Sequence, residues 1–444
     1  MPRSLEQWLA YQSQVHPQAI DLGLDRLMQV LESLGWRQPT VPVITVAGTN
    51  GKGSVSGYCA AIMRAAGYRV GTFTSPHLRD YRERIGVHDR LVSAAELVSA
   101  FERIEAARGE VGLTFFEFNT LAALLVFEAA KLDAWVLEIG MGGRLDAVNV
   151  VEPDVAVVVS IGFDHQEYLG TTLEAIGREK AGVFRRGRAA VLGSLDMPDV
   201  VEARARAIGA PLKRLGREFS YTAEGAGWRY RGSRWDLPRL PAPALVGVTQ
   251  YANAATAIAA LEEIAARLVM PAAAVARGLT QVRLVARFQV IAPAAPDSPV
   301  WILDVAHNPA AARVLARNLR EHPSGGRTLA VCGILADKDA AGVVAELRDC
   351  VHAWWCIPTE GERGRSGTSL AQMIRRQVAA PVEAADSTAA GCAAALAHAK
   401  PMDRIVVFGS FHTVGPVLDW LESHDLLPPA TLPEYTAAPQ ATYV

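Results

Sequence analysis

The stretch VAGTNGKGSV, residues 46–55, has the residue types of a phosphate-binding loop. Its glycines let the backbone approach a phosphate, and the N–H groups that begin a following helix attract an anion. Lys52 would neutralise phosphate oxygens and Ser54 would reach Mg²⁺. The spacing departs from the common G-x-x-x-x-G-K-[ST] pattern, because Val46 replaces the first glycine and Gly53 separates the lysine from the hydroxyl. An ordinary glycine-rich turn is the alternative, but the strand-loop-helix context favours nucleotide binding.

Two later loops combine polar side chains with glycines. In LEIGMGGRLDAVN, Glu138 ends an expected strand, and a lone carboxylate beside a phosphate site suits Mg²⁺. A solvated glutamate is the alternative. In SIGFDHQEYLG, Asp164 and His165 follow another strand, and His165 would ligate a metal or move a proton, unless it is a structural histidine.

Lys180 lies in the otherwise apolar helical turn REKAGVF. A partly buried lysine loses its proton readily. The neutral amine adds CO₂ to give a carbamate, which is an anionic metal ligand. The residues alone favour the simpler interpretation, in which the stem is buried and the ammonium reaches solvent.

The elements that must position these residues alternate between short apolar runs and longer amphipathic runs. Strands are predicted at 41–48, 68–75, 133–140 and 155–162, and helices at 54–67, 118–132 and 173–184. This order predicts an α/β fold with a mostly parallel central sheet covered on both faces. In such sheets ligands bind beyond the carboxyl ends of the strands, where the glycine-rich loops fall.

The second half of the chain predicts another domain. Residues 221–237 alternate aromatic and polar side chains, which indicates a small β-ribbon, and residues 251–268 predict a helix. The Pro- and Ala-rich run 291–299 is the best boundary, since β-α alternation restarts after it. We therefore predict an ATP-binding domain at 1–290, a C-terminal α/β domain at 291–428 and a loosely held tail at 429–444.

Composition limits the class of protein. Half of the 444 residues are hydrophobic, a fifth are charged, and the net charge is -2, so a globular protein without affinity for nucleic acid or anionic membranes is expected. The five cysteines contain no C-x-x-C pair and predict small buried side chains in a reducing compartment. The N-terminus has no apolar signal core, and no apolar run is long enough to span a membrane, so cytoplasm is expected.

Several motifs occur in order: GTNGKGSV, TSPHL with YRERI, LEIGMGGRLDAVN, GFDHQEYLG with REKAG, DVAHNP, GILADKD and FGSFHTVG. Over residues 4–426 the chain resembles the folylpolyglutamate synthase/dihydrofolate synthase family of the Mur ligase superfamily. The shifted Lys-Gly-Ser is that superfamily's own phosphate loop. The resemblance implies a Mur-ligase-like P-loop domain followed by a Rossmann-like domain, closing over a cleft.

The resemblance also implies the reaction. ATP phosphorylates a carboxylate of dihydropteroate or tetrahydrofolate, and the amine of L-glutamate displaces phosphate to form an amide. Cations must hold the anionic reactants together, and the acyl phosphate must be kept from water. FGSFHTVG and TSPHLRDYRERI resemble chains with both activities, so a bifunctional monomer is expected.

Site residues follow from matching positions. The resemblance implies ATP contacts from Thr49, Asn50, Gly51, Lys52, Gly53, Ser54, Asn253, Arg287, Asp304 and His307. It implies two Mg²⁺ sites, one with Ser54 and Glu138 and one with His165 and carbamylated Lys180. Lys52, His165 and Lys180 are then the expected catalytic residues. The pterin-side loop implies substrate contacts from Ser75, Pro76, His77, Arg79, Arg82 and Arg84, although each arginine could instead belong to a solvated charged loop.

The sequence departs from the family pattern at Val305, at Val285-Ala286 and at Thr249, which affects loop geometry more than chemistry. Three alternatives remain. A monofunctional folylpolyglutamate synthase would lack one activity. A cell-wall Mur-type ligase usually carries a separate N-terminal domain, and about 45 residues precede the phosphate loop, too few for one. A nucleotide-binding module without ligase activity would be expected to have lost some of the catalytic side chains.

Overall fold

The computed structural model describes residues 3–292 and 298–427. The predicted tail at 429–444 and most of the predicted boundary run therefore lie outside the described residues. The described chain divides into a first unit, residues 3–244 with 251–282, and a second unit, residues 245–250 with 283–427. Residues 283–290, which the sequence prediction placed in the first domain, belong to the second unit.

The first unit is built on a mixed sheet with strand order β4-β3-β2-β5-β1-β6-β7-β8. Its parallel part contains β2 (Val70–Phe73), β5 (Ala134–Glu138), β1 (Val43–Ala47), β6 (Val155–Val158), β7 (Ala189–Leu192) and β8 (Leu212–Arg214). β3 (Ile85–Val87) and β4 (Arg90–Leu91) extend one edge in antiparallel pairing. Every residue of β1, β5, β6 and β7 is buried, as expected for parallel strands covered on both faces.

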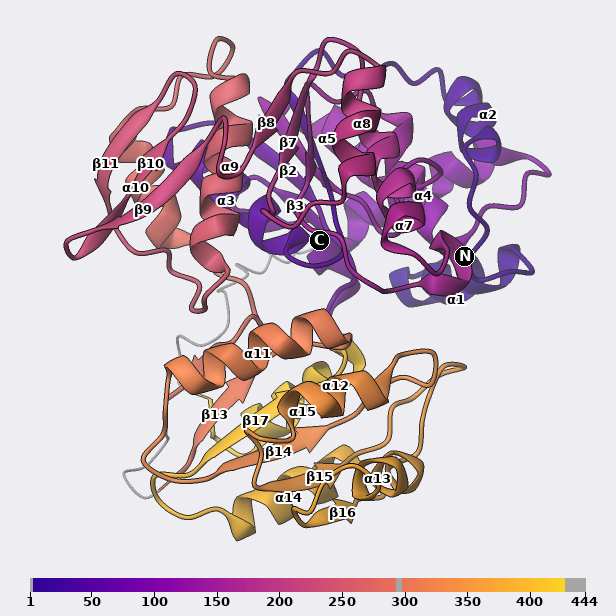
Figure 1. Cartoon of the computed structure of the whole chain (residues 1–444). Helices are drawn as coiled ribbons and strands as arrows, with labels where there is room; N and C mark the ends of the chain where they lie inside the picture. The colour runs from indigo at the N-terminus through magenta and orange to yellow at the C-terminus, as the bar shows by residue number, and fades with distance from the viewer. Residues whose placement is uncertain (1–2, 293–297, 428–444) are drawn as a thin grey trace, which may run out of the picture. The chain divides into compact units, whose positions relative to one another are not determined.

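Helices cover both faces of this sheet (Figure 1). One face carries α3 (Lys52–Ala65), α9 (Gln250–Glu263) and α10 (Ala272–Gln281). The other carries α4 (Ala94–Arg108), α5 (Phe115–Ala130), α7 (Leu173–Lys180) and α8 (Asp199–Ala207). The N-terminal α1 (Leu5–Val15) and α2 (Asp25–Ser33) pack against α4 and α5. Short turns complete the unit: α6 (Gln166–Leu169), η1 (Tyr81–Arg84), η2 (Ala147–Val150) and η3 (Ala181–Val183).

The predicted β-ribbon is confirmed as an antiparallel sheet of β9 (Ser220–Glu224), β10 (Gly227–Arg231) and β11 (Asp236–Leu240). Tyr230 is buried and its hydroxyl donates to the Glu262 carboxylate at 2.9 Å, which ties the ribbon to α9. The helix prediction over 251–268 is wrong at its end, because α9 stops at Glu263 and the chain continues as turns.

The second unit has a sheet with strand order β12-β13-β17-β14-β15-β16. β13 (Val300–Leu303), β17 (Arg404–Phe408), β14 (Thr328–Cys332), β15 (Ala353–Cys356) and β16 (Val382–Ala384) are parallel, and β12 (Gln289–Ile291) is antiparallel. Its helices are α11 (Pro309–Glu321), α12 (Ala340–Leu347), α13 (Gly367–Arg375), α14 (Thr388–His398) and α15 (Phe411–Ser423). The α/β prediction is thus confirmed, and the pairing of β12 with β13 is why residues just before the boundary run join this unit.

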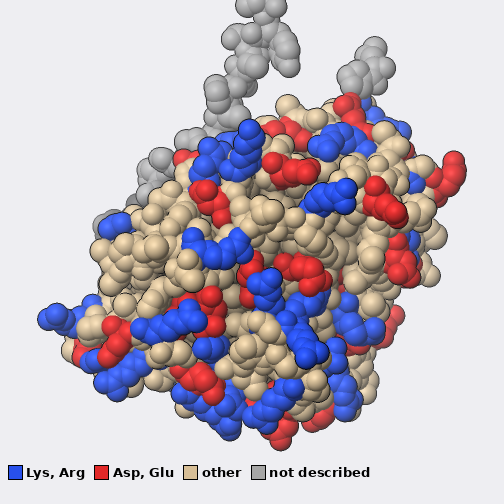
Figure 2. Space-filling model, turned by 90° about the horizontal axis from the view of Figure 1, so that it is seen from above, with Lys and Arg blue, Asp and Glu red and all other residues tan. Residues whose placement is uncertain are grey.

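The expectations drawn from amino-acid composition concern the cysteines, the surface charge and membrane-spanning segments. All five cysteines are buried and free, as predicted. Basic and acidic side chains are interspersed on the face shown in Figure 2. In the described part of the chain, no helix is both long and apolar enough to cross a bilayer.

Candidate active site

The phosphate loop joins β1 to α3 at the carboxyl edge of the first sheet. Gly51 has a positive φ of 86°, and a Cβ there would lie 2.8 Å from Val159 Cγ1 and 3.0 Å from Asn253 Oδ1, so only glycine fits. No side-chain hydrogen bond caps the start of α3 in the described structure, which leaves its N–H groups directed at the loop. Asn253 of α9, which the family resemblance implies as a nucleotide contact, therefore lies against the loop.

Residues 160–162, just beyond β6, hold the loop in place. The Thr49 hydroxyl donates to Gly162 O at 3.1 Å and accepts from Gly162 N at 3.0 Å. The Ser160 hydroxyl accepts from Asn50 N at 3.1 Å and donates to Asn50 O at 2.9 Å. These bonds hold the loop in one conformation, ready for an anion.

Two lysines converge on one carbonyl of this loop. The Lys52 ammonium donates to Gly48 O at 3.1 Å, and the Lys180 ammonium donates to the same oxygen at 3.0 Å. Lys180 is only 4% exposed, so the prediction that its ammonium reaches solvent is wrong. Burial, and next the charge of Lys52, lower the pKa of Lys180 to about 7, against the opposing effect of Asp164 and Asp146.

The side chains at this edge of the sheet suit both an anion and a divalent metal. Two ammonium groups beside one oxygen repel each other, and a polyphosphate or a carbamate would relieve that repulsion. Ser54, in the first turn of α3, and Glu138, at the end of β5, are both buried at the same sheet edge. Glu138 lies opposite Val46 in the register of β5 and β1. The donor set therefore fits Mg²⁺ bound mainly through phosphate oxygens.

No cluster of three His, Cys, Asp or Glu side chains able to hold a metal occurs among the described residues.

Asp164 and His165 lie in the loop between β6 and α6. His165 has a positive φ of 50°, a conformation uncommon for residues other than glycine. Its Nε2 lies 3.9 Å from Asp164 Oδ1, and its backbone N–H donates to the same carboxylate oxygen at 2.9 Å. Asp164 also acts electrostatically on Lys180, which places this loop near the lysine pair.

The expected substrate loop lies between β2 and β3, with a cis peptide bond between Ser75 and Pro76. Of its three arginines only Arg84 is buried. Arg84 Nε donates to His77 Nδ1 at 2.8 Å, and the guanidinium lies 5.7 Å from the ring centre of Phe115.

The other two arginines lie on the surface of this loop. Arg82 pairs with Asp80, with Nε at 2.9 Å from the carboxylate, so its charge is already balanced. Arg79 is tied by its backbone N–H to the Glu83 carboxylate at 3.0 Å. The solvated-loop alternative therefore fits Arg82 better than Arg84.

The second unit brings together another set of predicted residues. Asp304 follows β13, and its carboxylate accepts from Phe288 N at 2.9 Å and Ala306 N at 2.8 Å. Burial raises the pKa of Asp304, while the nearby Arg287 opposes that rise. The Arg287 guanidinium lies 5.2 Å from the Phe411 ring centre, and His307 Nδ1 is 2.9 Å from Val305 O.

The last two residues of the GILADKD motif take part in local hydrogen bonds. Asp339 caps α12 through a hydrogen bond from Gly342 N at 2.8 Å, and the backbone N–H of Lys338 donates to Leu335 O at 3.2 Å.

Asp146 is a residue that the sequence analysis missed. It is buried, and its carboxylate accepts from Met141 N at 2.9 Å and Val148 N at 3.0 Å. Burial raises its pKa to about 6, although these hydrogen bonds and the charge of Lys52 oppose the rise. The signal was present, because Asp146 lies within the quoted GGRLDAVN motif.

Comparison with known proteins adds to this geometry. The Mur ligase middle domain matches residues 46–211, and the Mur ligase glutamate ligase domain matches residues 286–411. Dihydrofolate synthase/folylpolyglutamate synthase of Escherichia coli K12 is 42% identical over 94% of this chain and 96% of its own length. The protein of that name from Haemophilus influenzae is 36% identical over 92% of this chain and 96% of its own length.

Solved structures agree with these matches. E. coli FolC in complex with DHPP and ADP has a TM-score of 0.90 and 41% identity, covering 95% of this chain and 99% of that one. A bifunctional folylpolyglutamate synthase/dihydrofolate synthase with Mn, AMPPNP and L-glutamate bound has a TM-score of 0.86 and 42% identity, covering 95% and 98%. The enzyme from Yersinia pestis CO92 has a TM-score of 0.86 and 43% identity, with the same coverage.

Proposed function

The chain belongs to the dihydrofolate synthase/folylpolyglutamate synthase family of Mur ligases, and on that premise we propose how its own residues carry out the reaction. The resemblance found in the motifs is confirmed. The protein is an ATP-dependent ligase that forms an amide between a pteroate or folate carboxylate and L-glutamate in folate metabolism. The other kinds of Mur-type ligase and the single-activity alternative are not favoured.

The reaction has two steps with defined needs. The substrate carboxylate takes the γ-phosphoryl group of ATP, so that a carboxyl O–P bond forms and ADP leaves. The amine of L-glutamate then attacks the acyl carbon, phosphate leaves, and the amine gives up a proton as the amide forms. Both reactants in the first step are anionic, so the protein must supply positive charge and exclude water.

The convergence of Lys52 and Lys180 on Gly48 O is the observation that carries this proposal. We assign Lys52, with the N–H groups of residues 49–54, to the ATP phosphates. Ser54 and Glu138 hold one Mg²⁺, and His165 with Lys180 surrounds a second. Bound Mg²⁺ would neutralise phosphate oxygens and increase the electrophilicity of the γ-phosphorus.

Lys180 serves as a carbamate in this proposal. The buried ammonium first releases one proton, the neutral amine attacks CO₂ so that a nitrogen–carbon bond forms, and a second proton leaves to solvent, so the side chain changes from cation to anion. The site favours this change, since the ammonium is buried beside Lys52 and the carbamate would be attracted to it. The product is an oxygen ligand of the kind that Mg²⁺ prefers.

Substrate contacts are proposed for the loop between β2 and β3. Arg84 is the strongest candidate to meet the substrate's carboxylate, because it is buried and oriented by His77. Ser75 and Pro76 shape the loop, and the surface arginines Arg79 and Arg82 contribute charge. Contacts with the nucleotide are proposed for Asn253, Arg287, Asp304 and His307. We also infer a cytoplasmic monomer, which light scattering of the purified protein would test.

The test supplies Mg-ATP and L-glutamate to the purified protein, with dihydropteroate or tetrahydrofolate monoglutamate added separately. Mass spectrometry counts the glutamates on each product. Addition to both substrates is expected, and addition to one alone would refute the bifunctional assignment. Lys52→Ala should abolish both products, whereas Lys400→Ala, an exposed lysine of the second unit, should leave them unchanged.

A further inference from the structure

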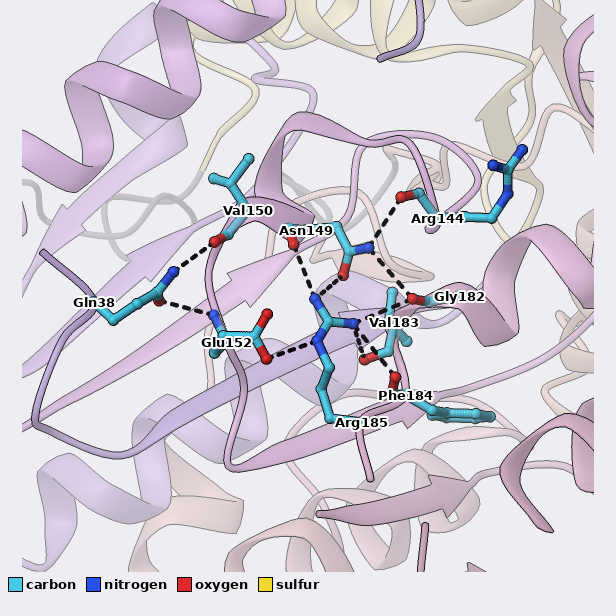
Figure 3. A network of polar contacts seen from close by, with 9 residues as sticks. All are labelled: Gln38, Arg144, Asn149, Val150, Glu152, Gly182, Val183, Phe184 and Arg185. Atoms are coloured by element: carbon cyan, nitrogen blue, oxygen red, sulfur yellow. Dashed lines mark hydrogen bonds and ion pairs between the residues drawn. The ribbon is translucent and has the colours of Figure 1, made fainter. Parts of the chain in front are cut away.

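A network of polar contacts links the loop that follows Glu138 to the turn that follows Lys180 (Figure 3). At its centre is Asn149, in the 3-10 turn η2, which is buried and takes no direct part in the proposed chemistry. We propose that Asn149 is a positioning residue, which ties the loop that follows Glu138 to the turn that bears Lys180 and so fixes the spacing of these two ligands. This inference rests on the function proposed above for Glu138 and Lys180.

The side-chain amide of Asn149 bridges the two segments. Its Nδ2 donates to the carbonyl oxygen of Arg144 at 3.0 Å and to that of Gly182 at 3.3 Å. Arg144 lies in the loop that leaves β5 at Glu138, and Gly182 lies in η3, directly after Lys180. One donor group therefore holds a carbonyl from each segment.

Arg185 determines which way this amide points. Its guanidinium donates to Asn149 Oδ1 at 3.2 Å and to Asn149 O at 3.0 Å, so the oxygen side of the amide is occupied and Nδ2 must face the two carbonyls. The same guanidinium donates to Gly182 O at 3.3 Å and Val183 O at 3.2 Å. Arg185 therefore holds the end of the Lys180 turn as well as the amide that bridges it, as the converging dashed lines in Figure 3 show.

The two bridged segments are also in direct van der Waals contact. A Cβ at Gly143 would lie 2.8 Å from the carbonyl oxygens of Glu179 and Lys180. A Cβ at Gly182 would lie 2.6 Å from Arg144 Cα. Arg144 N also donates to Glu179 O at 2.9 Å. Because the two backbones are in contact, we expect removal of the bridge to shift the turn that bears Lys180 relative to the loop that follows Glu138.

The outer edge of the network provides a matched control. Glu152 pairs with Arg185 Nε at 2.8 Å, but its side chain is 58% exposed. Exposed pairs of this kind contribute little, because water screens them. Glu152→Gln should therefore leave the bridge intact, although it touches the same guanidinium.

The experiment compares Asn149→Ala and Asn149→Asp with Glu152→Gln and the wild type. The aspartate would face two carbonyl oxygens without a proton to donate. Carbamate on Lys180 is read by ¹³C NMR after incubation with ¹³C-bicarbonate, in the absence of nucleotide. The Mg²⁺ concentration for half-maximal turnover is measured separately, and circular dichroism reports folding. Loss of a residue that orients metal ligands typically costs about 10–100-fold in metal affinity or activity.

We expect both Asn149 variants to stay folded, to lose carbamate signal and to need about 10–100-fold more Mg²⁺, whereas Glu152→Gln matches the wild type. Folded Asn149 variants with unchanged carbamate and unchanged Mg²⁺ requirement would overturn the inference. If the wild type itself shows no carbamate, that part of the proposed function fails, and the Mg²⁺ requirement still decides the role of Asn149. If the Asn149 variants do not fold, Arg185→Lys, which keeps charge but loses the forked contacts, is judged by the same readings.

Discussion

Replacing Lys180 with methionine should stabilise the fold while abolishing activity. Methionine has a similar length and no charge, so it fills the same buried space without an ammonium group. The wild-type side chain bears the cost of a charge buried beside Lys52. The enzyme retains the lysine despite this loss of stability, because its amine is the group proposed to form the carbamate.

The size of the effect follows from the pKa of Lys180. A fall from 10.5 to about 7 corresponds to about 5 kcal/mol, at about 1.4 kcal/mol per tenfold change in acidity. The folded-state pKa lies below the unfolded-state pKa. The free-energy cost of burying the Lys180 ammonium is therefore fully present below pH 7 and disappears as the pH rises towards 10.5. About 4 kcal/mol remains at pH 7 and about 1 kcal/mol at pH 10. The lost hydrogen bond to Gly48 O offsets about 1 kcal/mol, although Lys52 still donates to that oxygen.

Lys180→Met should therefore raise the free energy of unfolding by about 3 kcal/mol at pH 7 and by almost nothing at pH 10. Urea unfolding in CO₂-free buffer at both pH values measures the difference, and the transition of the first unit is identified by its shift with Mg-ATP. Lys400→Met, at an exposed position, should show no such pH-dependent gain. A variant less stable than the wild type at pH 7, or a gain equal at both pH values, would refute the reasoning.

Three further predictions concern other parts of the molecule. Gly51→Ala forces alanine into a left-handed conformation against Val159 Cγ1. This change should lower the free energy of unfolding by about 2–4 kcal/mol, measured by urea unfolding. It should also weaken ATP binding at least about tenfold, measured by calorimetry. Burial raises the pKa of Asp403, but hydrogen bonds, chiefly from Arg327, lower it by more than burial raises it. The pKa of Asp403 therefore lies below its ordinary value. Asp403→Asn should therefore cost about 2 kcal/mol at pH 7, and the stabilities of variant and wild type should converge as the pH falls below about 4 in acid unfolding curves. Removing divalent metal with EDTA should stop product formation, Mg²⁺ should restore it, and turnover unaffected by EDTA would count against a metal-dependent site.

Much of the fold could be read from the sequence because its strands are strongly patterned. β1, β5 and β6 are continuous apolar runs that end in glycine-rich loops, and both features are visible without a structure. β12 and β16 have three residues each and were not predicted, since such short segments carry no periodicity and depend on a neighbouring strand for their hydrogen bonds.

The candidate site shows the same limit. Local order along the chain was enough to single out Lys52, Ser54 and Glu138, because the first two closely follow β1 and Glu138 ends β5. The burial of Lys180 was not predictable from its helix, since it depends on Gly48, 132 positions away. The role of Asn149 was hidden for a similar reason, as its partners are backbone carbonyls, which every residue has.

The packing of α10 on α3 has a consequence for how the protein is made. Arg277 donates to Ala65 O at 2.8 Å across 212 positions of sequence, and a Cβ at Gly278 would lie 2.4 Å from Ile62 Cα. A ribosome adding about 5–20 residues per second needs roughly 10–40 s to cover that distance. During this interval the nascent chain carries the phosphate-loop helix with its apolar outer face uncovered. Messages truncated before α10 should therefore yield aggregating chains, and chaperones would be needed most while this segment is being translated.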